Sequence, residues 1–471
     1  MDTNSANKKL LDKTFLYIIG NFGSKILNFI IVPLYSYYID TNSMGYYDVI
    51  ITTMSLLQPV IMLQMTDGVY RWLIETSDLS KQKNIISTVL KTLFKCFVIF
   101  CVLFLLINNY FHFKYAASIL LLIISHVIYA ILQQISRGVQ KNKLYTFCGI
   151  LYTAIMLSIN CIGLLVFNLG IEILIISQII ANLICSLIIV LKIPIISKSI
   201  FVHEAKSIRT DILKYSIPLI PTTICWWLIS SSDRYIILRF LGASANGIYS
   251  MSNKFPTILS TITNIFYLAW QESAILEYNT PHRNVFFSNI FQKYSKLLFS
   301  TACFLIPATK IYIIYFLESS YKTAWYYSGF LYLGVIFNSL SSFLGLGYQI
   351  SKETSKSLYT TIIASIINVF VNISLVNFIG LQAASLSTFV AYLILFVIRI
   401  FHTKSYYSLD INWKEFLLYF IVTFIICIIM FISNLISTVL ITILFFIGFI
   451  ILNKSLLINV FHSLLNKLHR G

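Results

Sequence analysis

Residues 96–107 read CFVIFCVLFLLI, an unbroken apolar run without alternation of polar and apolar residues. A run of this kind lacks the period-two pattern of a barrel strand and predicts a helix that is apolar on every side. Similar runs recur from one end of the chain to the other. Because a bilayer offers the backbone no hydrogen-bond partners, the pattern predicts an all-α polytopic membrane protein.

The composition leads to the same class of protein. Of the 471 residues, 58% are hydrophobic and 11% are charged, whereas soluble domains are about 25% charged. The net charge of +17 is divided among short segments between apolar runs, which favours anionic lipid headgroups over nucleic acid as partners. The eight cysteines lie in apolar stretches without a CxxC or Cys/His cluster. We therefore expect free buried thiols, no metal site and no cofactor.

The apolar runs predict about fourteen transmembrane helices joined by short connectors. No small-residue cleavage site follows the first run, so we expect it to remain as the first helix. The longest polar connectors are expected near 194–211 and 271–295. The predicted helices cover residues 14–35, 46–69, 85–107, 116–136, 145–167, 171–193, 212–235, 246–269, 296–317, 324–348, 357–377, 381–401, 414–432 and 435–452.

The distribution of Lys and Arg predicts the orientation, because basic residues resist translocation. With a cytoplasmic N-terminus, the outer connectors hold Lys114, Arg239 and Lys322. Six further cations lie within predicted helices, and the remaining 25 of the 34 basic residues fall on the inner side. Both termini are therefore expected in the cytoplasm. The six cations within helices are Lys25, Lys91, Lys95, Arg234, Lys254 and Lys310.

Reporter fusions test this orientation. Fusions after residues 40, 110 and 241 should report an outside location, and fusions after 80, 140 and 204 a cytoplasmic one, because the inner connectors carry the basic residues. The reversed pattern would contradict the argument from charge.

Short sequence similarities indicate an internal repeat. MGYYDV at 44–49 resembles NGIYSM at 246–251, and the segment that starts at Gly170 resembles the one that starts at Gly380. Six helices separate these pairs, so both halves have one orientation, and the repeat axis is expected to be normal to the membrane. We expect an N-lobe at 1–200, a C-lobe at 201–405 and a helix pair with a cytoplasmic tail at 406–471. A substrate cavity is expected at the lobe interface.

Residues 213–275, from LKYSIPLIPTTICWW to FYLAWQESAI, are the most specific passage of the chain. They resemble Wzx-type polysaccharide repeat-unit flippases of the multidrug/oligosaccharidyl-lipid/polysaccharide exporter superfamily. SKILNFIIVPLYSYYI near the start, DGVYRWL at 67–73 and NISLVNFIGLQAASLST at 372–388 resemble the family as well. The resemblance implies two six-helix lobes around a central cavity. It also implies an undecaprenyl-diphosphate-linked oligosaccharide as cargo.

Charged side chains inside hydrocarbon are costly and usually face a cavity or a partner. Lys25, with Asn21 and Asn28 on the same helix face, is a candidate for binding a pyrophosphate, and so is Lys254, near Pro256. An interhelical hydrogen bond is the alternative for both lysines. Arg234 is a further candidate, although Asp233 or a lipid headgroup is able to satisfy it. For Lys91, Lys95 and Lys310 we expect snorkelling to headgroups.

Other candidates lie near the ends of helices. Arg71 follows Asp67 at a spacing that allows an ion pair, and it is either a gate or headgroup contact or a plain topology charge. Glu272 occupies the corresponding place in the second lobe, and Asp67, Asp233 and Glu272 are candidates for coupling or gating. Trp226 and Trp227 are able to stack on sugar rings, with packing or an interfacial belt as the alternative. His126 is expected to be a hydrogen-bonded core histidine.

The expected function is translocation of a lipid-linked oligosaccharide from the cytoplasmic to the outer leaflet of a bacterial inner membrane by alternating access. The product would serve a polysaccharide polymerase, and glycosyltransferases would supply the substrate. No catalytic constellation or phosphate-binding glycine loop is found. One rival is a cation-coupled drug exporter of the same superfamily, which the net-cationic helices disfavour. The other is a membrane glycan polymerase, which would need a large outer loop.

Overall fold

The computed structural model describes residues 29–278, 280–351, 353–454 and 458, and every regular element within them is helical. The chain forms two compact units, of which the first ends at Trp227 and the second begins at Leu228. This boundary lies inside one helix, later than the lobe boundary at residue 200 that the repeat predicts. The all-α membrane fold is confirmed.

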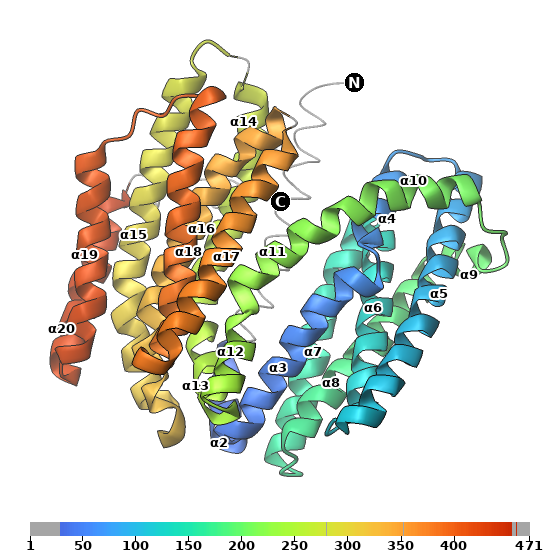
Figure 1. The fold of residues 1–471 in the computed structure, drawn as a ribbon, viewed down its shortest axis with the longest axis horizontal. Coiled ribbons are helices and arrows are strands. Elements are labelled where there is room, and N and C mark those ends of the chain that lie inside the picture. The colour runs from blue at the N-terminus through green and yellow to red at the C-terminus, as the bar shows by residue number, and fades with distance from the viewer. Residues whose placement is uncertain (1–28, 279, 352, 455–457, 459–471) are drawn as a thin grey trace. The chain divides into compact units, whose positions relative to one another are not determined.

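The first unit consists of membrane-length helices and short connecting ones. Figure 1 shows α6, α7 and α8 running side by side, with α10 near the end of α4. Its elements are α2 (Val32–Tyr38), α3 (Thr41–Ile61), α4 (Met65–Ile74), α5 (Leu79–Phe111), α6 (Ala116–Gly138), α7 (Asn142–Leu165), α8 (Ile171–Lys192), α9 (Ile195–Ser199), α10 (Lys206–Ser216), η1 (Ile217–Leu219) and α11 (Ile220–Ser231), which continues into the second unit.

Two helices of the first unit, α3 and α5, begin at polar caps, and the helices of this unit bury their apolar faces against each other. The side chains of Asp40 and Asp78 accept hydrogen bonds from backbone N–H groups in the first turns of α3 and α5, as N-cap residues do. Buried aliphatic side chains of α4, α5, α6 and α8 form one continuous core. Gly138 allows a close approach of α6 to α4, because a Cβ there would lie 2.7 Å from the Cβ of Leu73.

Helices α3 and α4 form a bent pair with an angle of 55° between them. Leu63 and Gln64, between the two helices, have positive φ values of 46° and 51°. L-residues adopt this left-handed conformation with difficulty, so it interrupts the regular helix. The predicted span 46–69 is therefore present, but with a break near its C-terminal end.

The second unit is also a helical bundle. Figure 1 shows α16, α17 and α18 close together, with α15 beside α19 and α20. Its elements after α11 are α12 (Asp233–Phe240), α13 (Ala243–Lys254), α14 (Pro256–Glu277), α15 (Arg283–Phe316), η2 (Ser319–Ala324), α16 (Trp325–Ile350), α17 (Thr354–Ile379), α18 (Gln382–His402), η3 (Thr403–Ser405), α19 (Trp413–Ile432) and α20 (Leu435–Leu452).

An aromatic core holds the second unit together. Phe337 of α16 is 1% exposed, and its ring contacts Phe299 of α15, Phe396 of α18 and Phe420 of α19 at centroid distances of 5.4–6.2 Å. Such ring pairs contribute about 0.5–1.5 kcal/mol beyond the area they bury. The contacts tie the C-terminal helix pair to the rest of the bundle.

Eleven described helices are long and apolar enough to cross a membrane, or up to twelve if the bent pair counts as one span. Each of the eleven helices, and the bent pair, corresponds to a predicted span. Of the two remaining predicted spans, 14–35 lies mostly outside the described residues. The other, 246–269, forms α13 and α14, which meet at Phe255 just before Pro256. The predicted connector 271–295 is wrong, because α14 and α15 extend through most of it.

Lys310 of α15 connects the C-terminal helix pair to the bundle. Its Nζ donates to the carbonyl oxygens of Met430 and Ser433 at 2.6 and 2.7 Å and lies 4.1 Å from the ring centroid of Trp325. The two carbonyls end α19, where the helix dipole places partial negative charge. The side chain is 4% exposed, so the expectation that it snorkels to a headgroup is wrong.

Replacing Lys310 with Met should lower the free energy of unfolding by about 1–3 kcal/mol, because the carbonyls at the end of α19 lose their donor in a buried place. Thermal unfolding of the purified protein in detergent measures the loss. Lys322→Met is the matched control, since Lys322 is exposed and its loss should change stability by less than about 0.5 kcal/mol. Equal stability of the two variants would contradict the capping role.

Candidate functional site

Four of the predicted site residues lie beyond what the structure describes. Lys25, Asn21 and Asn28 fall before residue 29, and the side chain of Glu272 is outside the described part. Their roles stay predictions.

Asp233 and Arg234 form a buried ion pair at the start of α12. The guanidinium Nη1 of Arg234 lies 2.6 Å from Oδ1 of Asp233, and the two side chains are 11% and 1% exposed. Arg234 also donates to the backbone oxygen of Ser230 at 2.7 Å. The structure therefore satisfies Arg234 with Asp233, which is one of the two alternatives that the sequence leaves open.

A phenol completes the surroundings of this pair. Tyr249 of α13 donates its hydroxyl hydrogen to Oδ2 of Asp233 at 2.5 Å, and its ring lies 5.4 Å from the Arg234 guanidinium. Both carboxylate oxygens are thus engaged, one by a cation and one by a neutral donor. The sequence analysis missed Tyr249, although it lies within the NGIYSM motif that marks the repeat.

Asn368 of α17 extends the polar cluster, and a second asparagine, Asn372, follows it on the same helix. The side chain of Asn368 lies 3.4 Å from the hydroxyl of Ser232 and 3.5 Å from that of Thr388. Asn372, one turn further along the helix, is fully buried, and neither Nδ2 nor Oδ1 of its amide has a hydrogen-bond partner in the described part of the chain. Buried amides normally find partners. The spacing of four residues between Asn368 and Asn372 in an apolar stretch is the sequence signal by which both could have been identified.

Lys254 is the last residue of α13 and is half-buried. Pro256 begins α14 two residues later. Because proline has no N–H, it removes a backbone hydrogen bond from the preceding turn. The cation therefore lies next to an interruption in backbone hydrogen bonding within the predicted span 246–269.

Arg71 and Asp67 of α4 do not pair with each other. Asp67 accepts a hydrogen bond from Gln64 at 2.8 Å, and Arg71 lies 3.4 Å from Glu75. The Arg71 guanidinium is 4.7 Å from the ring centroid of Tyr215 in α10. The ion pair that the spacing allows is thus not formed, because the face of Tyr215 and the carboxylate of Glu75 hold the arginine. Its side chain remains 52% exposed.

The close contact of α4 with α10 positions Tyr215. A Cβ added to Gly68 would lie 2.5 Å from the hydroxyl of Ser216 and 2.8 Å from Ile212. Only a residue without a side chain therefore permits this approach. DGVYRWL thus contains the glycine that brings α10 up to Arg71.

Trp227 packs within the first unit. Its indole Nε1 donates to the backbone oxygen of Thr52 and to the hydroxyl of Ser55, both at 3.1 Å. Both partners belong to α3, so the tryptophan joins α11 to α3. This geometry supports the packing alternative for Trp227. Trp226 is half-buried, and its stacking role stays a prediction.

His126 of α6 is a hydrogen-bonded core residue, as predicted. Its Nε2 lies 3.1 Å from Oε1 of Gln58 in α3. Nδ1 of the ring has no partner among the described residues. Groups of three or more His, Cys, Asp or Glu side chains that could hold a metal ion are not found within the described ranges.

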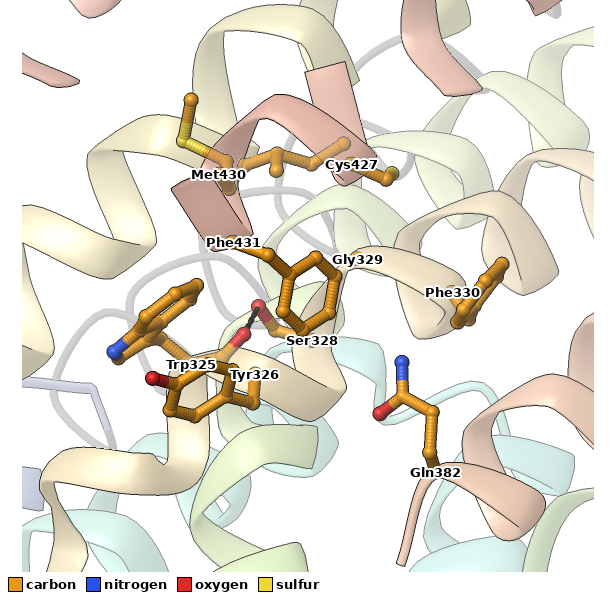
Figure 2. A pocket seen from close by; sticks show the side chains of 10 residues that line it. Trp325, Tyr326, Ser328, Gly329, Phe330, Gln382, Cys427, Met430 and Phe431 are labelled. Carbon is orange, nitrogen blue, oxygen red and sulfur yellow. Dashed lines mark hydrogen bonds between the residues drawn. The ribbon is translucent and has the colours of Figure 1, made fainter. Parts of the chain in front are cut away.

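A hollow in the second unit lies between the start of α16 and the end of α19 (Figure 2). Four aromatic rings line it together with Gln382, namely those of Trp325, Tyr326, Phe330 and Phe431. Its empty volume is about 300 Å³, and part of this is open to the surroundings. The aromatic rings leave little enclosed space between them, so this hollow does not provide a cavity for an oligosaccharide.

The family model described as polysaccharide biosynthesis protein matches residues 10–270. A curated relative, an uncharacterized membrane protein of Methanocaldococcus jannaschii, is 25% identical over 222 residues, which are 44% of this chain. The match spans about half of that relative, 48% of its length.

Solved structures show the same fold. The lipid II flippase MurJ in an inward closed conformation gives a TM-score of 0.67 at 15% identity, with 94% of this chain and 100% of that chain covered. An inward-facing multidrug resistance MATE family transporter of the MOP superfamily gives 0.66 at 12% identity, with 83% and 95% covered. At these identities the likeness establishes the fold alone.

Proposed function

The chain belongs to the polysaccharide biosynthesis protein family, and from this premise we propose that it is a flippase for undecaprenyl-diphosphate-linked oligosaccharides. It moves the headgroup from the cytoplasmic to the outer leaflet by alternating access. The proposed location is the inner membrane of a bacterium, with both termini in the cytoplasm. Neighbouring glycosyltransferases supply the substrate and a polymerase uses the product.

The observation that carries this proposal is the cationic character of the intramembrane candidates. Lys254 is half-buried within the predicted span 246–269, and Lys25 is expected within another. A diphosphate carries several negative charges, and charge-assisted hydrogen bonds to cations are the strong way to hold it. We propose that the two lysines bind the diphosphate while the polyprenyl tail stays in the bilayer.

Arg71 is the proposed first contact of the headgroup. The geometry supports this, because Tyr215 and Glu75 fix the guanidinium while about half of its surface stays accessible. A guanidinium that stacks on a ring keeps donors free for a phosphate. The exposed carboxylate of Asp67 is proposed to act as part of a gate.

Asp233 is the proposed coupling residue. Its carboxylate is buried, and Arg234 and Tyr249 occupy its oxygens. Protonation of this group, or binding of a Na⁺ ion nearby, would change the charge balance of a cluster that has little contact with water. Asn372, whose amide atoms have no partner among the described residues, supports such a role. Glu272 is kept as the coupling candidate near the end of α14.

A drug exporter of the same superfamily is the main rival, since MATE transporters share the fold. A site for cationic drugs needs exposed carboxylates in the cavity. Asp233 is the buried carboxylate among the candidate residues, and Arg234 neutralises it. A membrane glycan polymerase is the rival from another class, and the short outer connectors count against it.

Deletion of the gene tests the proposal. The deletion strain should lose a surface glycan and accumulate lipid-linked repeat units in the inner leaflet, because synthesis continues without translocation. Expression of the wild-type chain should restore the glycan. Unchanged surface glycan with increased sensitivity to cationic drugs would favour the exporter.

Arg71 provides a graded test of the entry step. Arg71→Lys should keep part of the transport rate, and Arg71→Gln should lower it about ten-fold, because one charge-assisted hydrogen bond contributes about 1.5–3 kcal/mol. The rate is measured with membrane expression matched. The control is Arg137→Gln, which removes an α6 cation that stacks on Tyr70 of α4, the helix that carries Arg71. Equal rates for both Gln variants would make Arg71 a topology charge.

A further inference from the structure

The connector between α8 and α10, residues 193–205, exposes two large apolar side chains outside any membrane span. Phe201 is 87% exposed and Ile200 is 54% exposed. No other large apolar side chain in the described part has a larger exposed fraction than Phe201. The spans on either side end at Lys192 and begin at Lys206. The connector therefore has to lie within a few residues of the bilayer surface.

This connector is fixed in place on α5. The backbone oxygen of Val202 accepts hydrogen bonds from the hydroxyl of Ser87 and from Nζ of Lys91, both at 2.6 Å. The backbone N–H of Ala205 donates to the hydroxyl of Thr88 at 3.1 Å. Two side chains of α5 thus hold the backbone of Val202. Because Val202 follows Phe201 directly, these contacts also fix the exposed position of Phe201.

An ion-pair network secures the end of the connector. Glu204 lies 2.6 Å from Nζ of Lys95 and 2.7 Å from Nη1 of Arg209. The hydrogen bond from Lys95, together with the charge of Arg209, lowers the pKa of Glu204 below its usual range. The expectation that Lys91 and Lys95 snorkel to headgroups is therefore wrong, because both bind the connector.

Three lysines that flank the apolar pair in sequence are not part of this ion-pair network. Lys192, Lys198 and Lys206 are exposed, and the ion pairs of the described residues include none of them. The carboxylate of Glu204 is already engaged by two other cations. Along the chain, three exposed lysines thus flank the exposed apolar pair.

From this arrangement we propose that connector 193–205 is a membrane-surface anchor that selects anionic lipids. Ile200 and Phe201 insert into the interfacial layer of the inner leaflet, and Lys192, Lys198 and Lys206 bind lipid phosphates. Cations near an anionic leaflet contribute about 1 kcal/mol each, and apolar rings at the interface add to this by burial. The anchor is separate from the proposed substrate site, and it makes the protein respond to the charge of its membrane.

Photo-crosslinking in nanodiscs tests the insertion. The full-length protein carries the photo-reactive residue benzoylphenylalanine in place of Phe201, in a mixture of phosphatidylglycerol and phosphatidylcholine. Mass spectrometry should detect lipid adducts at 201 as abundant as those at Phe94, an exposed residue within the α5 span. Glu75, exposed at the end of α4, is the aqueous control. Adducts at 201 no more abundant than at 75 would overturn the insertion.

The lipid selectivity is tested with the same probe. Changing Lys192, Lys198 and Lys206 to Gln should lower the ratio of phosphatidylglycerol to phosphatidylcholine adducts at 201 about five-fold or more. Lys141→Gln with Lys143→Gln, at the start of α7, should leave the ratio unchanged. An unchanged ratio in the triple variant would overturn the selectivity. If crosslinking in native membranes captures a protein and no lipid at 201, the surface is a protein-docking site and the proposal is wrong.

Discussion

Lys254→Glu should abolish transport, whereas Lys254→Arg should keep most of it and Lys254→Gln should lose about ten- to hundred-fold. The reason is the sign of the charge. Arg still donates to the diphosphate, Gln removes a charge-assisted hydrogen bond worth about 1.5–3 kcal/mol, and Glu repels the anion. The three variants are compared by complementation of the deletion strain, with the amount of protein in the membrane checked for each.

The order of the three variants separates binding from packing. Lys254 lies at the end of α13 beside Pro256, and a lysine there is able to serve as a plain hydrogen-bond donor. In that case Gln should complement as well as Lys, which would contradict diphosphate binding. The same series at Lys25 should give the same order if both lysines hold one diphosphate. Lys322→Glu, at an exposed lysine of η2, is the control for added negative charge.

Asp233→Leu should cost about 3–5 kcal/mol of stability and prevent transport. Removal of the carboxylate leaves the guanidinium of Arg234 in a buried place without its ion-pair partner and deprives Tyr249 of its acceptor. Thermal unfolding in detergent measures the loss. The exposed pair of Lys356 and Glu353 provides the control, because Glu353→Gln should change stability by less than about 1 kcal/mol.

The double variant Asp233→Leu with Arg234→Met decides whether the pair acts as a unit. Replacing a buried ion pair by apolar side chains of similar volume is often neutral for stability. The double variant should therefore be more stable than Asp233→Leu alone, while transport stays absent because the proposed coupling group is missing. Transport by a stable double variant would remove Asp233 from the coupling mechanism.

The spans could be predicted because their signal is local. Twenty apolar residues in succession exclude other structures in a membrane. Each of the eleven described spans, and the bent pair of α3 and α4, coincides with a predicted span. The break between α3 and α4 was not predictable in this way. It depends on two residues with positive φ, neither of which is a glycine that would have marked the turn.

The side-chain partners of the cations could be predicted only when they were adjacent in sequence. Asp233 could be identified as an ion-pair partner of Arg234 because the two residues are adjacent in the sequence. Lys310 instead binds carbonyl groups 120 and 123 residues away, and sequence spacing carries no information about such contacts. Lys91 and Lys95 bind a connector more than 100 residues away.

Arg399, near the C-terminal end of the predicted span 381–401, shows the same limit. It lies in α18 with an exposed fraction of 2%, and it donates to the backbone oxygen of Ser341 at 2.9 Å and to the hydroxyls of Ser357 and Thr361. A Cβ at Gly345 would lie 2.5 Å from its Nη1. A glycine on one helix and hydroxyls on another create the site, and these features become visible only in the folded bundle.

Translocation by the purified protein tests the central claim most directly. Proteoliposomes should carry an undecaprenyl-diphosphate oligosaccharide with a fluorescent label on the glycan, and a membrane-impermeant quencher should report the leaflet of the label. The wild-type protein should move the label between leaflets, and the Lys254→Glu variant, equally well incorporated, should not. Absence of movement with the wild-type protein, together with uptake of a cationic dye by the same vesicles, would contradict the account and identify a drug exporter.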